Sequence, residues 1–222
     1  MTRIPLPSPQ TMTPDQRRVY EAIVGGPRGT LIGPLRAAIH SPELADRWQR
    51  LGEFLRYRTS LPPRLNELAI LVTARRWNSQ IEWYVHAAAA RKAGLPGTVI
   101  EAIQYGRVPE FENPDETAVY EYVRELHEFG QVSDQAYQNV RAKWDAIGVV
   151  ELTALVGYYT MVAMTLNAHE IPLPDGAEPP LETAAANESA SRNSGPERRR
   201  GLATLPPARF GNSAAARSGG SC

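Results

Sequence analysis

The sequence has almost no cysteine. Of its 222 residues only Cys222, at the last position, carries a thiol. One thiol cannot form an intrachain disulfide, a CxxC redox pair or a zinc site built from several cysteines. Any chemistry that the protein performs must therefore come from other side chains.

An excess of charge of either sign is also missing. Lys and Arg together number 24, as do Asp and Glu, so the formal net charge is zero. Without a uniform basic field, neither nucleic acid nor a membrane surface is an expected partner. The first residues contain no apolar run of signal-peptide length, and we therefore expect a cytoplasmic protein.

Segments that alternate apolar and polar residues are scarce, whereas signals for the start and end of helices recur along the chain. One helix begins after Ser41, with Leu44, Trp48, Leu51 and Leu55 at helical spacing on one apolar face. The other predicted helices cover residues 14–24, 35–39, 64–77, 80–93, 97–105, 115–129, 134–144 and 149–168. The fold class is therefore all-α, as a multi-helix bundle.

Two of these helices, 64–77 and 149–168, are apolar on more faces than a monomer of this size readily covers. The second has no Asp, Glu, Lys or Arg between Glu151 and Glu170. Its threonines, tyrosines and Asn167 make it too polar for a membrane span, so it belongs in a core or a subunit interface. A homo-oligomer is the expected assembly.

The composition changes at Leu173, after which Pro, Ala, Ser, Gly, Asn, Glu and Arg dominate. Such a segment buries too little apolar surface to offset the entropy of ordering it. We therefore expect one all-α domain over residues 1–172 and a disordered C-terminal tail over residues 173–222.

Glu82 and His86 form the first candidate site. Their i, i+4 spacing places both side chains on one face of a helix, close enough to hydrogen bond. A carboxylate that fixes the tautomer of an imidazole is typical of general acid–base catalysis. An ordinary exposed Glu/His pair without a catalytic role has the same spacing, so this alternative stays open. A metal is not expected, because two ligands do not complete a site.

The run from Arg64 to Ile103 resembles the central segment of the carboxymuconolactone decarboxylase family, within the alkylhydroperoxidase D-like superfamily. The resemblance rests on an ELxxLxxAR helix with Glu67 and Arg75, and on an ExxxH helix with Glu82 and His86. An A-G-L stop and an Ile/Val-rich helix follow. The segment 151–174 resembles the longer members of the family.

The peroxidase branch of this superfamily carries two cysteines where this chain has Ser79 and Glu82. A thiolate is the nucleophile toward a peroxide, and neither a hydroxyl nor a carboxylate can form a sulfenic acid and then a disulfide. The sequence therefore excludes a thiol peroxidase and resembles the cysteine-free branch.

This resemblance implies a decarboxylase that needs no cofactor and acts on a small carboxylated lactone or a related acid. His86 is the expected proton donor, Glu82 its orienting partner and Glu67 a second acid–base group. Arg75 either binds the substrate carboxylate or pairs with Glu67 or Glu82. Trp83 is a pocket wall or part of the core. The family also implies a trimer or hexamer.

Two further classes remain open at this point. One is another acid–base enzyme on the same scaffold, such as an isomerase or hydrolase. The other is a non-catalytic assembly or binding protein that kept the fold. A void beside Glu67, Glu82 and His86 would favour an enzyme, whereas a filled site would favour the non-catalytic protein.

Overall fold

The computed structural model describes residues 2–174 and 176–182, and this part of the chain contains eight helices and no strand. The all-α fold predicted from the sequence is thus confirmed. The helices are α1 (Pro14–Val24), α2 (Leu35–Ala38), α3 (Pro42–Tyr57), α4 (Pro63–Arg76), α5 (Gln80–Lys92), α6 (Gly97–Gln104), α7 (Pro114–Phe129) and α8 (Asp134–Ala168).

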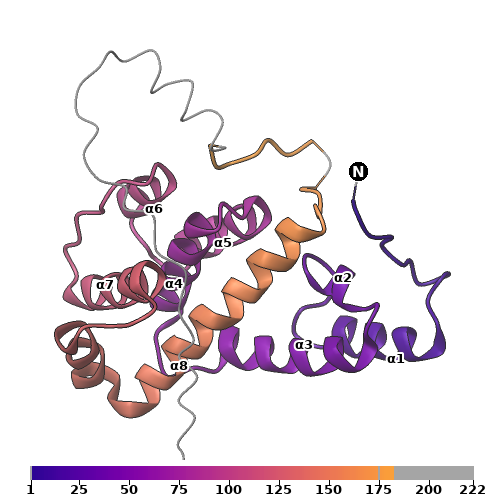
Figure 1. Cartoon of the computed structure of the whole chain (residues 1–222), viewed down its shortest axis with the longest axis horizontal. Helices are drawn as coiled ribbons and strands as arrows, with labels where there is room; N and C mark the ends of the chain where they lie inside the picture. The colour runs from indigo at the N-terminus through magenta and orange to yellow at the C-terminus, as the bar shows by residue number, and fades with distance from the viewer. Residues whose placement is uncertain (1, 175, 183–222) are drawn as a thin grey trace, which may run out of the picture.

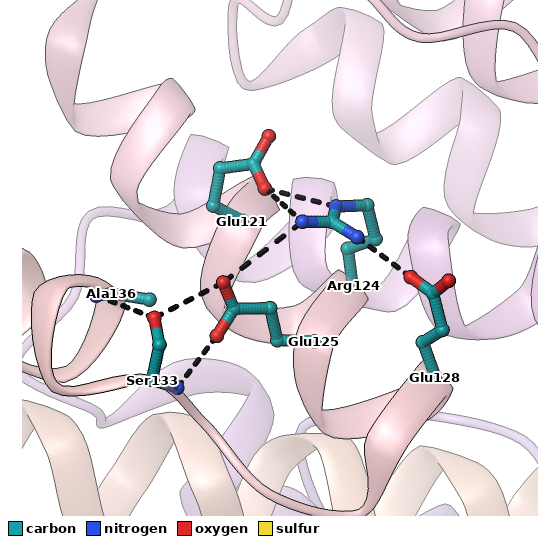
Figure 2. Close-up of polar contacts among 6 residues, drawn as sticks. All are labelled: Glu121, Arg124, Glu125, Glu128, Ser133 and Ala136. Atoms are coloured by element: carbon teal, nitrogen blue, oxygen red, sulfur yellow. Dashed lines mark hydrogen bonds and ion pairs between the residues drawn. The ribbon is translucent and has the colours of Figure 1, made fainter.

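Local signals explain most helix ends. Thr13 and Gln16 form a reciprocal capping box at the start of α1. Gly130 ends α7 in the left-handed region, with φ of 69°, which glycine adopts without steric cost. The α7–α8 turn is held by Glu125, whose carboxylate accepts hydrogen bonds from the Ser133 N–H at 2.7 Å and from its hydroxyl (Figure 2).

The structure joins the two helices expected over 134–144 and 149–168 into the single helix α8. A kink divides α8 at Asp145, where φ is 54° and ψ is −166°. No proline lies at this point, and the Asp145 carboxylate accepts a hydrogen bond from the following N–H of Ala146 at 2.8 Å. The backbone at Asp145 is not helical, so the break that the sequence predicted between the two helices is present within α8.

Helix α8 runs diagonally through the molecule, with α4–α7 on one side and α1–α3 on the other (Figure 1). Helix α4 lies at the centre, in contact with α3, α5, α6, α7 and α8. Nine of its fourteen residues are buried. This packing explains why α4 is apolar on most faces, and it means that α4 needs no second subunit to cover it.

Helix α3 departs from the expected apolar face. Trp48 and Leu55 are buried, but Leu44 and Leu51 are 49% and 47% exposed. The helix packs mainly against α1, α2 and α8. These neighbours cover only a narrow stripe, which leaves the side that carries the other two leucines in solvent.

The chain continues to pack against the bundle beyond the expected boundary at residue 172. Leu181 is buried, and its main chain exchanges two hydrogen bonds with the side chain of Gln80 on α5. Gln104 donates a further bond to the carbonyl of Pro180 at 2.7 Å. One apolar side chain thus anchors a segment whose average composition predicted a tail. Residues 183–222 of the predicted tail lie outside the described residues.

Helix α8 is long and apolar enough to span a membrane by length and composition, with a mean hydropathy of 1.6 over its most apolar window. Half of that window is buried inside the fold. Such burial is typical of the core helix of a bundle.

Candidate active site

A hydrogen bond between two neighbouring helices defines the site. His86 on α5 and Glu67 on α4 are both buried, and Nδ1 of the imidazole lies 2.7 Å from Oε2 of the carboxylate. A carboxylate accepts hydrogen bonds, so this contact places a proton on Nδ1. Nε2 makes no hydrogen bond to the described residues and is left to exchange a proton with a ligand.

Glu82 does not orient His86, contrary to the expectation from the i, i+4 spacing. Its side chain is 2% exposed, and neither carboxyl oxygen has a hydrogen-bond partner among the described residues. Burial raises the pKa of Glu82 from 4.5 to about 8, against a smaller opposing effect of the nearby Ser79 hydroxyl. At neutral pH Glu82 is therefore mainly an uncharged carboxylic acid.

A cavity of about 500 Å³ borders this group and is lined by both Glu82 and His86. Its wall on α8 contains Tyr158 and Tyr159. The Tyr159 ring meets the His86 ring edge to face, with centroids 5.0 Å apart, and the Tyr158 ring lies 5.3 Å beyond it. Glu67 does not line the cavity, and its carboxylate forms the hydrogen bond to His86 from outside the lining. A void is thus present beside two of the three predicted residues, Glu82 and His86.

Three arginines that sequence reasoning missed also line the cavity: Arg28 in the loop after α1, Arg36 on α2 and Arg56 on α3. They lie far from the Glu/His motifs in the sequence. Only the packing of α1–α3 against α8 brings them to the site. The run of Gly and Pro around Arg28 indicated a loop, but nothing in it indicated which cavity the loop would border.

Arg75 lies elsewhere. It borders a second cavity of about 320 Å³ between α4, the end of α6 and α7, and it forms no ion pair with Glu67 or Glu82. The predicted ion pair of Arg75 with Glu67 or Glu82 is therefore wrong, because Arg75 sits roughly 80° around the helix axis from Glu67, and Arg75 does not line the cavity beside His86. Trp83 is 2% exposed and packs in the core rather than on the cavity wall.

The second cavity is lined by four arginines that differ in their ion pairing. Among the arginines that line it, Arg124 bonds Glu121 and Glu128, each at 2.6 Å (Figure 2). Arg107 pairs with Glu101 at 3.2 Å. Arg75 and Arg76 form no ion pair with the described residues, and Nε of Arg75 is buried without a hydrogen-bond partner among them.

The remaining histidines have structural contacts. His127 shares a hydrogen bond of 2.9 Å with the Thr73 hydroxyl, and burial together with the charge of Arg76 lowers its pKa to about 4. Nε2 of His40 lies 2.6 Å from the carbonyl oxygen of Pro5. Within residues 2–174 and 176–182, no group of three or more His, Cys, Asp and Glu side chains is placed to hold a metal ion.

The fold and site define a class: an α-helical bundle in which glutamate and histidine from adjacent helices face a ligand-sized cavity. Residues 42–125 match the model of the carboxymuconolactone decarboxylase family. The resemblance predicted from the sequence is confirmed.

Two solved structures share the fold. An alkylhydroperoxidase AhpD core, an uncharacterised peroxidase-related protein from Ralstonia eutropha JMP134, superposes with a TM-score of 0.64 at 12% identity, over 78% of this chain and 93% of its own. A peroxidase-related protein from Silicibacter sp. TM1040 gives 0.62 at 14% identity, over 77% and 89%. At these identities the likeness concerns the fold alone. No curated protein matches the chain.

Proposed function

We propose that the protein is an acid–base lyase that needs no cofactor and decarboxylates a carboxylated lactone or related acid. The observation that carries this proposal is the 2.7 Å bond between Glu67 and His86 at the wall of a cavity of about 500 Å³. An oriented imidazole beside a ligand-sized void is the arrangement that general acid–base catalysis requires.

The reaction follows from the groups present. Cleavage of the C–C bond releases CO₂ and leaves its electron pair delocalised into the substrate carbonyl as an enolate. His86 delivers a proton from Nε2 to carbon and regains one from water, while the Glu67 carboxylate stabilises the imidazolium form. Glu82, kept neutral by burial, donates a hydrogen bond to the enolate oxygen.

The cavity supports this function over a non-catalytic role. A protein that kept only the fold would have no need for a desolvated carboxyl group without a partner, which costs about 1–3 kcal/mol of stability. Glu82 is such a group. Unsatisfied buried polar groups that persist in a fold are typical of sites that serve catalysis.

The test is a panel of carboxylated unsaturated lactones and related acids, incubated with the purified protein in D₂O. CO₂ release and ultraviolet absorbance would report turnover, and NMR would report deuterium in the product. We expect release of CO₂ from at least one compound, with one deuterium at the carbon that lost the carboxylate. Consumption of a compound without CO₂ release would instead favour an isomerase or hydrolase.

A further inference from the structure

The cavity beside His86 carries uncompensated positive charge. Arg28, Arg36 and Arg56 all line it, and none forms an ion pair with any residue that the structure describes. Among the described residues of the lining, Glu82 carries the only carboxyl group, and it is mainly neutral at pH 7. A cavity lined in this way attracts an anion and gains affinity from its low-dielectric walls.

Two of these arginines lie near the same tyrosine. Burial raises the pKa of the Tyr158 hydroxyl, and the charges of Arg28 and Arg56 oppose that shift. The Nε atom of Arg28 is itself buried without a hydrogen-bond partner among the described residues. An unpaired guanidinium nitrogen of this kind is a donor that a bound anion would satisfy.

Arg28 and the acid–base pair lie at separate places in the cavity. From Arg28 the wall continues through the rings of Tyr158 and Tyr159 to the ring of His86. A carboxylate held by arginines is stabilised in its ground state, so it is not the group that would be lost as CO₂. The charge bound at Arg28 must therefore belong to a second acidic group of the ligand.

Apolar side chains make up much of the rest of the cavity wall. They come from α5, from α8 and from the segment after α8, and include Ile81, Val85, Val162, Leu166 and Ile171. The volume of about 500 Å³ is in the range of sites for drug-sized ligands, ~300–1,000 Å³. A compact lactone would leave much of it empty.

We propose that Arg28 and Arg56 form an anion-binding subsite, and that the substrate is an apolar-bodied organic acid whose anionic anchor lies here while its reacting end lies at His86. This assignment rests on the proposed function only for the position of the reacting end. The anchor and the apolar body follow from the cavity alone.

Binding calorimetry tests the subsite with probes that need no turnover. The probes are biphenyl-4-carboxylate, its neutral carboxamide, benzoate and biphenyl-4-yl phosphate. We expect biphenyl-4-carboxylate to bind about 10-fold or more tightly than the carboxamide, because a charge-assisted hydrogen bond is lost in the amide. Benzoate should also bind more weakly, because its apolar body is shorter. The phosphate ester shows which anion the subsite prefers, and tight binding of either anion supports it.

Substitutions locate the subsite. Arg28→Gln and Arg56→Gln should each weaken binding of the carboxylate about 10-fold, with no effect on the carboxamide. Arg28→Lys keeps the positive charge but lacks the paired N–H donors of the guanidinium group. It should therefore weaken binding of the carboxylate less than Arg28→Gln does. Arg47→Gln is the matched control, because Arg47 lies on α3 with its side chain 77% exposed and pairs with Glu43.

Equal binding of the carboxylate and the carboxamide, or wild-type affinity in both glutamine variants, would overturn the subsite. So would the absence of binding by any anionic probe. A failure of the proposed function would appear differently, as anion binding that depends on Arg28 and Arg56 without turnover of any acid.

Discussion

The two glutamates of the site differ in their surroundings. Glu67 meets a ring nitrogen at 2.7 Å, whereas Glu82 is buried without any partner among the described residues. Two carboxyl groups with different environments are a common way for one site to supply both a charged and a neutral group. Each role leads to a substitution with a specific outcome.

Glu67→Gln tests the charged role. The amide keeps the shape of the side chain but removes the charge that stabilises a protonated imidazole, so turnover should fall by about 10²-fold or more. The unfolding free energy should change by much less than for loss of a core side chain. Steady-state rates on a substrate from the panel provide the measurement. Wild-type rates in this variant would show that Glu67 has no part in proton transfer.

Glu82→Gln tests the neutral role through stability. In the unfolded chain Glu82 ionises near pH 4.5, but in the fold it stays protonated until about pH 8. Between these pH values the native state holds one proton more than the unfolded chain. Ionisation of Glu82 in the unfolded chain therefore lowers the stability of the wild type as the pH rises. The effect is at most about 1.4 kcal/mol per pH unit.

The glutamine variant lacks this dependence. Urea unfolding at several pH values from 5 to 8 should therefore show its stability rising relative to that of the wild type across this window. Parallel pH profiles of the two proteins would contradict a buried, neutral Glu82.

At the residue scale, the sequence motifs identified His86, Glu67 and Glu82, because family-like spacing is a local property of α4 and α5. They did not identify which glutamate meets the imidazole, since that depends on how the two helices pack. Arg28 and Arg56 carry no motif at all. Arg75 was assigned to the site by motif, although its phase on α4 turns it toward the second cavity.

At the scale of elements, the contact between α3 and α8 connects the N-terminal helices to the site. Gly52 on α3 is buried, and a Cβ atom there would collide with the hydroxyl of Tyr158 and with Nη2 of Arg28. Tyr158 cannot readily turn away, because its ring lies between those of Trp48 and Tyr159. The absence of a side chain at this position thus allows the cavity wall to form.

Gly52→Ala should therefore destabilise the protein. Replacing glycine by alanine inside a helix ordinarily gains about 0.5–1 kcal/mol, but the collision should cost about 1–3 kcal/mol. Gly97→Ala in α6 is the control, because a Cβ atom there would meet nothing within 4 Å. Urea midpoints should move in opposite directions for the two variants. A stability gain in both would show that α3 and α8 are not closely packed at Gly52.

Prediction of elements succeeded where the signals are local. The helices predicted over 14–24 and 115–129 agree with α1 and α7 to within one residue, because Thr13 and Gly130 are local signals at their ends. The exposed leucines of α3 and the anchoring of Leu181 could not be predicted from the sequence. Each of these depends on a neighbour distant in the chain.

At the scale of the whole molecule, α8 presents an apolar stripe to solvent. The residues of this stripe follow one another at alternating spacings of three and four positions. They are Ile147, Val150, Ala154, Gly157, Met161 and Met164. Ile147 and Val150 are 63% and 67% exposed, and Met164 is 47% exposed. This spacing is the one by which two helices pack side by side. The stripe, rather than the buried α4, now supports the expectation of a homo-oligomer.

Val150→Glu tests this expectation. A charge at the stripe would have to be buried in any assembly that uses it, so light scattering should show a lower mass for the variant than for the wild type. Gln138→Glu adds the same charge at an exposed position of α8 outside the stripe and should leave the mass unchanged. A wild-type protein that is monomeric at micromolar concentration would contradict the oligomer, including the trimer or hexamer that the family resemblance implies.

The central claim is that His86, held by Glu67, transfers the proton. The most direct measurement compares the rate of CO₂ release by His86→Ala with that of the wild type, on the acid that the panel identifies. His40→Gln serves as a histidine control outside the cavity lining, and circular dichroism verifies the helical fold of each variant. We predict a loss of about 10²–10⁴-fold for His86→Ala and none for His40→Gln. Full turnover by a folded His86→Ala variant would contradict the account.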